Sequence, residues 1–288
     1  MSTDRATGDA LPAALYAGPE AFQRERRTVF QTAWLLLARS ATLREPGAYV
    51  AQSLGGWPIF AIADSTGAAS VYRNVCRHQG LPLFDTGAGN CAEIRCRYHG
   101  WTYGADGRFK TAPPQVMPPD PADAVHHLDS VASKAFRGLL FVYLGGAPTA
   151  LEPAVAELDG ADFEALPFQG ETITDIDANW KVVMEHALAA APAGVSRRAV
   201  WPTLLIDAGA GGVVLHQVIP RAFQRTRIHH HRYGAAPAER TAAEANALKA
   251  AAAAAQAEVG RGAVPDLAST PALAAFRARV RSAHAAVT

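Results

Sequence analysis

The sequence has little charge, no long apolar run and few cysteines, and these shortages narrow the classes of protein it can be. Charged residues make up 18% of the 288 residues and the formal net charge is +1. Nothing in the charge therefore favours nucleic acid or an anionic membrane as a partner. No apolar run approaches the roughly 20 residues of a membrane span, and Met1 to Asp9 lack the apolar stretch of a signal peptide. We expect a soluble, cytoplasmic protein without a membrane or nucleic-acid partner.

Two short segments each combine a thiol with an imidazole. Cys76-Arg77-His78 and Cys96-Arg97-Tyr98-His99 together supply two Cys and two His, which is the ligand set of a Rieske [2Fe–2S] cluster. A four-coordinate zinc site uses the same atoms and stays open as an alternative. If Cys76 and Cys96 bind iron, only Cys91 remains and no disulfide framework can form, which suits a reducing compartment.

The residues around these ligands resemble the cluster-binding loops of the Rieske non-haem iron oxygenases, the ring-hydroxylating oxygenase alpha subunits. The resemblance is carried by Asn74–Gly80 (NVCRHQG) and Cys96–Trp101 (CRYHGW), although Gln79 and Arg97 stand where the family commonly has Arg and Pro. Respiratory-chain Rieske proteins carry an extra cysteine after each ligand pair, and Leu81 and Tyr98 occupy those places here. The resemblance implies an iron–sulfur cluster held by four residues, Cys76, His78, Cys96 and His99.

The resemblance also implies an α+β fold with two domains, and the pattern along the chain agrees. We expect residues 1–35 to form a helical segment, with a helix from Pro19 to Trp34, that packs on the C-terminal domain. Residues 36–148 predict an antiparallel Rieske β domain. Residues 149–288 resemble a shortened catalytic domain, in which a curved antiparallel sheet grips a long helix. Strands are expected at 58–62, 70–72, 138–143, 171–176, 213–219 and 225–231, a hairpin turn at 104–107, and helices at 180–190, 237–259 and 271–285.

One segment resembles the opening of the family's central catalytic helix and then departs from it. Asp177–Glu185 (DANWKVVME) carries this resemblance. In active members the helix continues with Asn, an acidic residue that relays electrons between subunits, and two His ligands of a mononuclear ferrous iron. In a gapless register His186 replaces the Asn, Ala189 the acid, and Pro192 and Arg197 the two His. Proline has no donor atom and Arg stays protonated, so the register predicts no mononuclear iron.

A site rebuilt from other residues is an alternative. The helix expected to carry the later carboxylate ligand has only alanine from 250 to 255. His186 on the helix and His229 or His231 on one face of a strand are the remaining candidate donors, because alternate strand residues share a face. The same histidines fit a pocket without a metal equally well. We expect His216 to be structural.

Three functions are compatible with these residues. In the first, the chain is the electron-transfer or structural partner of an intact oxygenase alpha subunit, in a hetero-oligomer based on the family's head-to-tail trimer. In the second it is a stand-alone Rieske electron carrier, and in the third an oxidoreductase with a rebuilt or repurposed active site. A ferredoxin or flavin reductase would supply the electrons. The chain is then an oxidoreductase component that does not oxygenate on its own, and neither the substrate nor the oligomer stoichiometry follows from the sequence.

Four arginines lie on or beside the presumed cluster loops, at positions 73, 77, 95 and 97. They are either a docking surface for an acidic electron donor or ordinary solvated charges. A docking role predicts that the rate of reduction falls as salt is added, because salt screens exposed charges.

Overall fold

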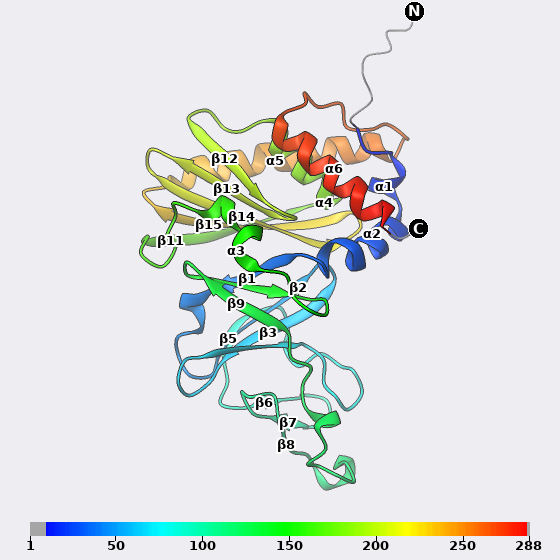
Figure 1. Ribbon diagram of the computed structural model, residues 1–288, viewed down its shortest axis with the longest axis vertical. Coiled ribbons are helices and arrows are strands. Elements are labelled where there is room, and N and C mark those ends of the chain that lie inside the picture. Colours follow the sequence, from blue (N-terminus) through cyan, green and yellow to red (C-terminus); the bar gives the residue numbers. More distant parts are fainter. Residues whose placement is uncertain (1–9, 287–288) are drawn as a thin grey trace, which may run out of the picture. The chain divides into compact units, whose positions relative to one another are not determined.

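The computed structural model describes residues 10–286, which form two compact units (Figure 1). One unit contains residues 35–148, and the other joins the chain up to Trp34 to the residues from Thr149 onward. In the described part of the chain, no helix combines the length and apolar character needed to cross a bilayer.

The unit of residues 35–148 is built from short antiparallel strands in three sheets. The sheets have the orders β4-β3-β2-β5, β6-β7-β8 and β1-β10-β9. The strands are β1 (Trp34–Arg39), β2 (Ala48–Leu54), β3 (Trp57–Ala63), β4 (Ala69–Arg73), β5 (Gly87–Asn90), β6 (Ile94–Arg95), β7 (Thr102–Tyr103), β8 (Phe109–Thr111), β9 (Ala132–Phe136) and β10 (Leu139–Tyr143). Single 3₁₀ turns lie at Ser40–Leu43, Pro114–Val116 and Ala124–His126. The hairpin turn expected at 104–107 is present and joins β7 to β8.

An aromatic core supports one end of this unit. Phe60, Tyr72, Trp101, Tyr103 and Phe109 belong to a single buried cluster that also contains both cysteines of the two motifs. An edge-to-face contact links Trp101 to Phe109, with ring centroids 4.7 Å apart. The two thiols are therefore anchored in a buried aromatic cluster.

The second unit is a five-stranded antiparallel sheet with three helices on one face (Figure 1). The sheet order is β11-β15-β14-β13-β12. Its elements are α3 (Leu151–Ala154), a 3₁₀ turn at Ala156–Leu158, β11 (Phe168–Ile176), α4 (Trp180–Ala189), β12 (Val195–Val200), β13 (Leu204–Gly209), β14 (Gly212–Ala222), β15 (Arg225–Gly234), α5 (Ala238–Val259) and α6 (Pro271–Ala285). The sequence predicted α4, α5, α6 and three of these strands, but not β12 or β13.

The N-terminal helical segment is more broken than predicted. It consists of α1 (Ala14–Ala17), α2 (Pro19–Glu25) and a π-helical turn at Arg26–Phe30. The expected helix from Pro19 to Trp34 is wrong at its C-terminal end, because Trp34 already begins β1. Aromatic residues of this segment pack onto α4, where Phe30 meets Trp180 with ring centroids 5.3 Å apart.

A buried group of charges ties these N-terminal helices to α4 and α6. Glu25 forms an ion pair with Lys181 at 2.7 Å, and both side chains are fully buried. Glu25 also contacts His284 Nε2 at 2.9 Å. One turn further along α4, Glu185 accepts from Arg277 at 3.0 Å and from the Tyr16 hydroxyl at 2.8 Å. Breaking a buried pair leaves an uncompensated charge, so this group fixes the position of α4.

Strand register divides the side chains of the sheet between its two faces. On β15, Ile228 and His230 line a cavity on the face that α4 and α5 cover. Because side chains alternate along a strand, His229 and His231 point to the opposite face. Glu171 on β11 lies directly across from His231 and shares that face. We refer to these two sides as the helix-covered face and the outer face.

Candidate functional site

The two cluster loops, residues 76–81 and 96–101, have the same backbone hydrogen bonds. In each loop the Cys amide donates to the carbonyl five residues later, at 2.8 Å, and the Gly amide donates back to the Cys carbonyl, at 2.9 Å. Gly80 and Gly100 have φ angles of +74° and +72°, the left-handed region that favours glycine. The repeated C-x-x-x-G spacing thus encodes two matching turns.

The loops bring the four predicted ligands to one end of the unit. Cys76 and Cys96 are each only 2% exposed, whereas His78 and His99 are partly exposed. The two imidazole rings meet edge to face with centroids 4.7 Å apart. His78 also stacks on Trp101, with an angle of 14° between the rings. The thiols therefore lie inside and the imidazoles lie toward solvent.

A metal group fits this donor set. His78 Nδ1 is buried and has no hydrogen-bond partner among residues 10–286. Burial raises the pKa of the Cys76 thiol, so the thiolate form needs a compensating positive charge. A buried imidazole nitrogen without a partner is costly unless it binds something.

Tyr103 is a residue of this site that the sequence did not indicate. Its hydroxyl lies 3.2 Å from Cys76 Sγ and accepts a hydrogen bond from the Arg77 amide at 3.0 Å. The residue-number spacing gives no sign of this contact, because β7 brings Tyr103 back beneath the first loop.

The four arginines near the loops are not equivalent. Arg97 makes a two-pronged ion pair with Asp85, with both contacts at 2.8 Å, and Arg77 pairs with Asp129 at 2.7 Å. Arg73 is partly buried and donates to the Leu144 carbonyl at 2.6 Å. Arg95 is exposed. Three of the four arginines thus have partners within the protein, the docking role stays a prediction, and Arg95 is the best candidate for it.

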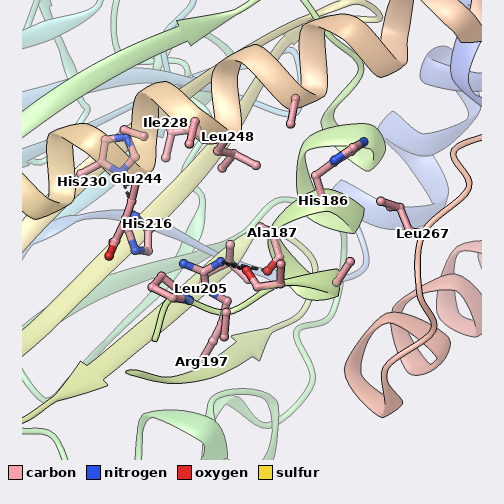
Figure 2. A pocket seen from close by; sticks show the side chains of 17 residues that line it. His186, Ala187, Arg197, Leu205, His216, Ile228, His230, Glu244, Leu248 and Leu267 are labelled. Atoms are coloured by element: carbon pink, nitrogen blue, oxygen red, sulfur yellow. Dashed lines mark hydrogen bonds between the residues drawn. The ribbon is translucent and has the colours of Figure 1, made fainter. Parts of the chain in front are cut away.

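A cavity of about 380 Å³ lies in the second unit, between α4, α5 and the helix-covered face of the sheet (Figure 2). Most of its wall is aliphatic, from alanines of both helices together with Leu205, Ile228 and Leu248. Its polar side chains are His186, Arg197, His216, His230 and Glu244. The wall is thus apolar with a few polar groups, as in many ligand sites.

The two positions that the gapless register assigns to the His ligands lie outside the central helix. Helix α4 ends at Ala189, Pro192 lies in the following turn, and Arg197 lies on β12. Arg197 nevertheless reaches the cavity, where it donates to the Ala187 carbonyl at 2.8 Å (Figure 2). It therefore caps the C-terminal end of α4, where unpaired carbonyls favour a cation.

Arg197 also begins a chain of buried polar contacts across the sheet, which we call the cavity chain. Arg197 Nε donates to Asp207 at 2.7 Å, and Asp207 accepts from His216 Nε2 at 3.0 Å. His216 and His230 meet through their Nδ1 atoms at 2.7 Å, and His230 Nε2 contacts the Thr174 hydroxyl at 3.1 Å. The expectation that His216 is structural agrees with these bonds, although its ring also lines the cavity.

One set of tautomers satisfies the whole cavity chain. Because the Asp207 carboxylate can only accept, a neutral His216 donates from Nε2 and accepts at Nδ1 from His230. Burial would raise the pKa of Asp207, but Arg197 and His216 lower it to about 2. Burial lowers the pKa of His230 to about 3. Asp207 is thus charged and His230 neutral at pH 7.

The cavity does not fit a mononuclear iron. His186 Nε2 is buried without a hydrogen-bond partner in the described chain, but the ring nitrogens of His216 and His230 are occupied by each other, Asp207 and Thr174. Figure 2 shows His186 apart from the paired rings. Among residues 10–286, the compact group of three possible ligands is elsewhere, at Glu171, His229 and His231. A site that combines His186 with His229 or His231 is wrong, because these residues lie on opposite faces of the sheet.

Comparison with known protein families gives one match. A family model described as the Rieske [2Fe-2S] domain matches residues 33–129. This match covers both cluster loops and Tyr103, and it supports the presence of a Rieske cluster.

Two curated relatives illustrate the sequence similarity. The oxygenase subunit of glycine betaine monooxygenase from Chromohalobacter salexigens is 32% identical over 190 residues, which are 65% of this chain and 42% of the relative. The large oxygenase component of a naphthalene 1,2-dioxygenase system from Pseudomonas aeruginosa is 31% identical over 186 residues, 60% of this chain and 40% of the relative. The matched region is less than half of each relative.

Solved structures show the same fold over nearly the whole chain. The apo form of a quaternary ammonium Rieske monooxygenase superposes with a TM-score of 0.81 at 18% identity, covering 96% of this chain and 97% of that one. A naphthalene 1,2-dioxygenase with indole bound superposes with a TM-score of 0.72 at 16% identity, covering 96% and 93%. The predicted α+β fold, a Rieske β domain with a helix-grip domain, is confirmed.

Proposed function

We propose that this chain, which is similar in sequence and fold to Rieske oxygenase alpha subunits, is an electron-transfer subunit whose own cavity holds no mononuclear iron. Its partner is an intact alpha subunit that supplies the oxygenating iron. One contrast carries this proposal. In the cluster loops His78 Nδ1 has no hydrogen-bond partner in the described chain, whereas in the cavity the donor atoms of Asp207, His216 and His230 already bond one another or their neighbours.

Cys76, His78, Cys96 and His99 hold the cluster in this proposal. When bound, a Rieske cluster exchanges one electron at a potential above that of an all-cysteine cluster, because two ligands are neutral imidazoles. The zinc alternative is disfavoured, because no three of these donors form a compact group within 4.8 Å among the described residues. A single zinc ion needs its ligands to converge, whereas a two-iron cluster is held by two separate pairs.

The protein around the loops has three tasks. The matched turns hold the two cysteines in a dry aromatic core, which keeps water from the thiolates. Tyr103 donates its hydroxyl hydrogen toward Cys76 Sγ and so stabilises negative charge on that sulfur. The two imidazoles lie toward solvent, so a partner protein can approach them closely.

The cavity chain explains why iron would not bind between α4 and the sheet. Arg197 keeps a positive charge beside the cavity wall and occupies both oxygens of Asp207. A ferrous ion would have to displace these contacts and then remain close to the guanidinium. The polar groups of the cavity wall that could bind a metal are thus largely used by a structural network.

A hetero-oligomer gives such a chain an electron acceptor. Head-to-tail contacts between subunits close into rings when the rotation permits, and a ring places one subunit's cluster beside the next subunit's catalytic domain. Rieske oxygenase systems take their electrons from reductases, so a ferredoxin or flavin reductase is the proposed donor.

Co-expression with an intact alpha subunit tests this proposal. We expect a single stable complex, and we expect Cys96→Ser in this chain to lower turnover of the complex while leaving its assembly intact. Unchanged turnover with that variant would make the chain only a structural member of the ring. If the two chains purify apart and the partner is fully active alone, a stand-alone Rieske electron carrier is the better account.

A further inference from the structure

Three side chains on the outer face of the sheet converge on one point. Glu171, His229 and His231, which we call the outer triad, each offer one donor atom, and these atoms all lie within 4.8 Å of one another. His229 Nδ1 is in hydrogen-bond contact with Glu171 Oε1. His231 Nδ1 lies 3.9 Å from the same oxygen. Two imidazoles therefore direct the same kind of nitrogen at a single carboxylate oxygen.

The backbone fixes this arrangement before any ion binds. Glu171 and His231 are direct partners across the antiparallel pair of β11 and β15, and His229 lies two residues before His231 on β15. The two imidazole rings are nearly parallel, with centroids 6.1 Å apart and an angle of 28°. The histidine side chains are 13% and 9% exposed, whereas that of Glu171 is 37% exposed. The two imidazoles are thus held by packing, and the carboxylate is the most exposed of the three groups.

The distances suit a first-row divalent ion. Bonds of about 2.0–2.2 Å from a zinc ion to nitrogen and oxygen place tetrahedral ligands about 3.4 Å apart. The donor atoms lie within 4.8 Å of one another, so reaching this separation requires changes of up to about 1.4 Å, shared between rotation of the Glu171 side chain and small shifts of the two imidazole rings. One carboxylate and two neutral imidazoles give the site a single negative charge, and the partly exposed edge leaves room for water as a further ligand.

We propose that the outer triad binds one divalent transition-metal ion that links edge strand β11 to β15. Two His and one carboxylate suit both Zn²⁺ and Fe²⁺, and the experiment below distinguishes them. This site lies on the opposite face of the sheet from the cavity, so it does not restore the family's iron site. Metal binding by the outer triad neither requires nor excludes electron transfer through the cluster.

The nearby contacts supply a matched control. Asp175 lies on the same face of β11 and forms a two-pronged ion pair with Arg227, with both contacts at 2.8 Å. Asp175→Asn therefore removes an exposed carboxylate from the same edge strand without touching the triad. His186→Ala removes the unpartnered histidine of the cavity on the helix-covered face.

Calorimetric titration of the chelator-treated full chain with ZnCl₂ tests the site. We expect one ion per chain, a rise in Tm with added Zn²⁺, and loss of both effects in Glu171→Gln and His229→Ala. Asp175→Asn and His186→Ala should bind as the wild type does. Unchanged circular dichroism and cooperative thermal unfolding of each metal-free variant show that the unit carrying the triad is folded, and an unchanged Rieske electron paramagnetic resonance signal shows the same for the cluster unit.

Metal analysis of the protein as purified identifies the ion that it takes in the cell. One zinc, or one iron beyond the two of the cluster, that is absent from His229→Ala supports the proposal and names the metal. Equal Zn²⁺ binding by the wild type and both triad variants would overturn it, leaving only a hydrogen-bonded Glu171–His229 pair. Loss of the ion in His186→Ala instead would place it in the cavity.

Discussion

The cluster loops and the cavity are both places where the family is expected to bind iron, yet their donor atoms are in opposite situations. In the loops, His78 Nδ1 is buried without a hydrogen-bond partner among the described residues 10–286. In the cavity, Asp207, His216 and His230 satisfy one another in a continuous chain that starts at Arg197. The comparison shows that the residue types near a site matter less than whether their donor atoms are already used.

The largest expected effect is in the cluster loops. His78→Ala or His99→Ala should abolish the Rieske signal in electron paramagnetic resonance of the reduced protein, because each change removes one of two ligands to the same iron. Gln79→Ala, in the same loop and exposed, should keep the signal. A zinc-containing, colourless wild-type protein would refute the cluster assignment.

The next largest effect is expected on the free energy of unfolding, when the cavity chain is broken. Asp207→Asn should destabilise the fold by about 3–5 kcal/mol, because Arg197 is left buried with a weaker partner. Asp175→Asn, which breaks an exposed pair of the same geometry, should cost about 0–1 kcal/mol. Denaturant unfolding of both variants measures the difference, and equal small losses would show that the cavity chain is not structural.

The free energy of unfolding that Asp207→Asn loses should depend on pH, because the pKa of Asp207 is lowered in the folded chain. Its pKa is lowered to about 2 in the folded chain, against about 3.9 in the unfolded chain. The stabilisation by the carboxylate is thus fully present above about pH 4 and disappears as the pH falls toward 2. The gap in unfolding free energy between the wild type and Asp207→Asn should narrow over that range, and a gap that stays constant would contradict the assigned charge.

A smaller effect is expected at Tyr103. Tyr103→Phe removes a hydrogen bond to the Cys76 sulfur and should lower the reduction potential of the cluster by on the order of 40 mV, which corresponds to about 1 kcal/mol for one electron. Protein-film voltammetry measures this shift. Tyr98→Phe, at an exposed tyrosine of the second loop, should leave the potential unchanged.

The smallest effect concerns the electron donor. Arg95→Ala should slow reduction by an acidic donor severalfold at low salt, and the difference should disappear at high salt. Arg97→Ala should have less effect, since Asp85 already neutralises that charge. Stopped-flow rates at several salt concentrations test this ranking, and rates that do not depend on salt would exclude a docking role.

Much of the fold was predictable because hydrophobic periodicity and short motifs can be recognised within a single stretch of sequence. The strands at β11, β14 and β15 and the helices α4, α5 and α6 were expected close to their actual ends. Strand β12 was missed because Ser196, Arg197 and Arg198 interrupt the apolar alternation. The gapless helix register gave no sign that the chain turns at Pro192 and enters β12. The cavity chain could not be recognised from the sequence because its members meet only across paired strands.

The cluster ligands and the outer triad also differ in how far the sequence could predict them. Cys76, His78, Cys96 and His99 could be proposed from spacing alone, because each pair lies within one short turn. The outer triad could not, because Glu171 lies 58 residues before His229 and only the register of β11 against β15 brings them together. The sequence nevertheless contained a signal, since residues 229 and 231 had to share a face.

The most direct test of the central claim is the iron content of anaerobically purified His229→Ala protein, measured together with Mössbauer spectra. The His229→Ala background removes the outer triad, so any iron beyond the cluster must lie in the cavity. We predict two irons per chain, both with the spectrum of a Rieske cluster. A third, high-spin ferrous iron that disappears in the His186→Ala, His229→Ala double variant would contradict the claim that the cavity holds none.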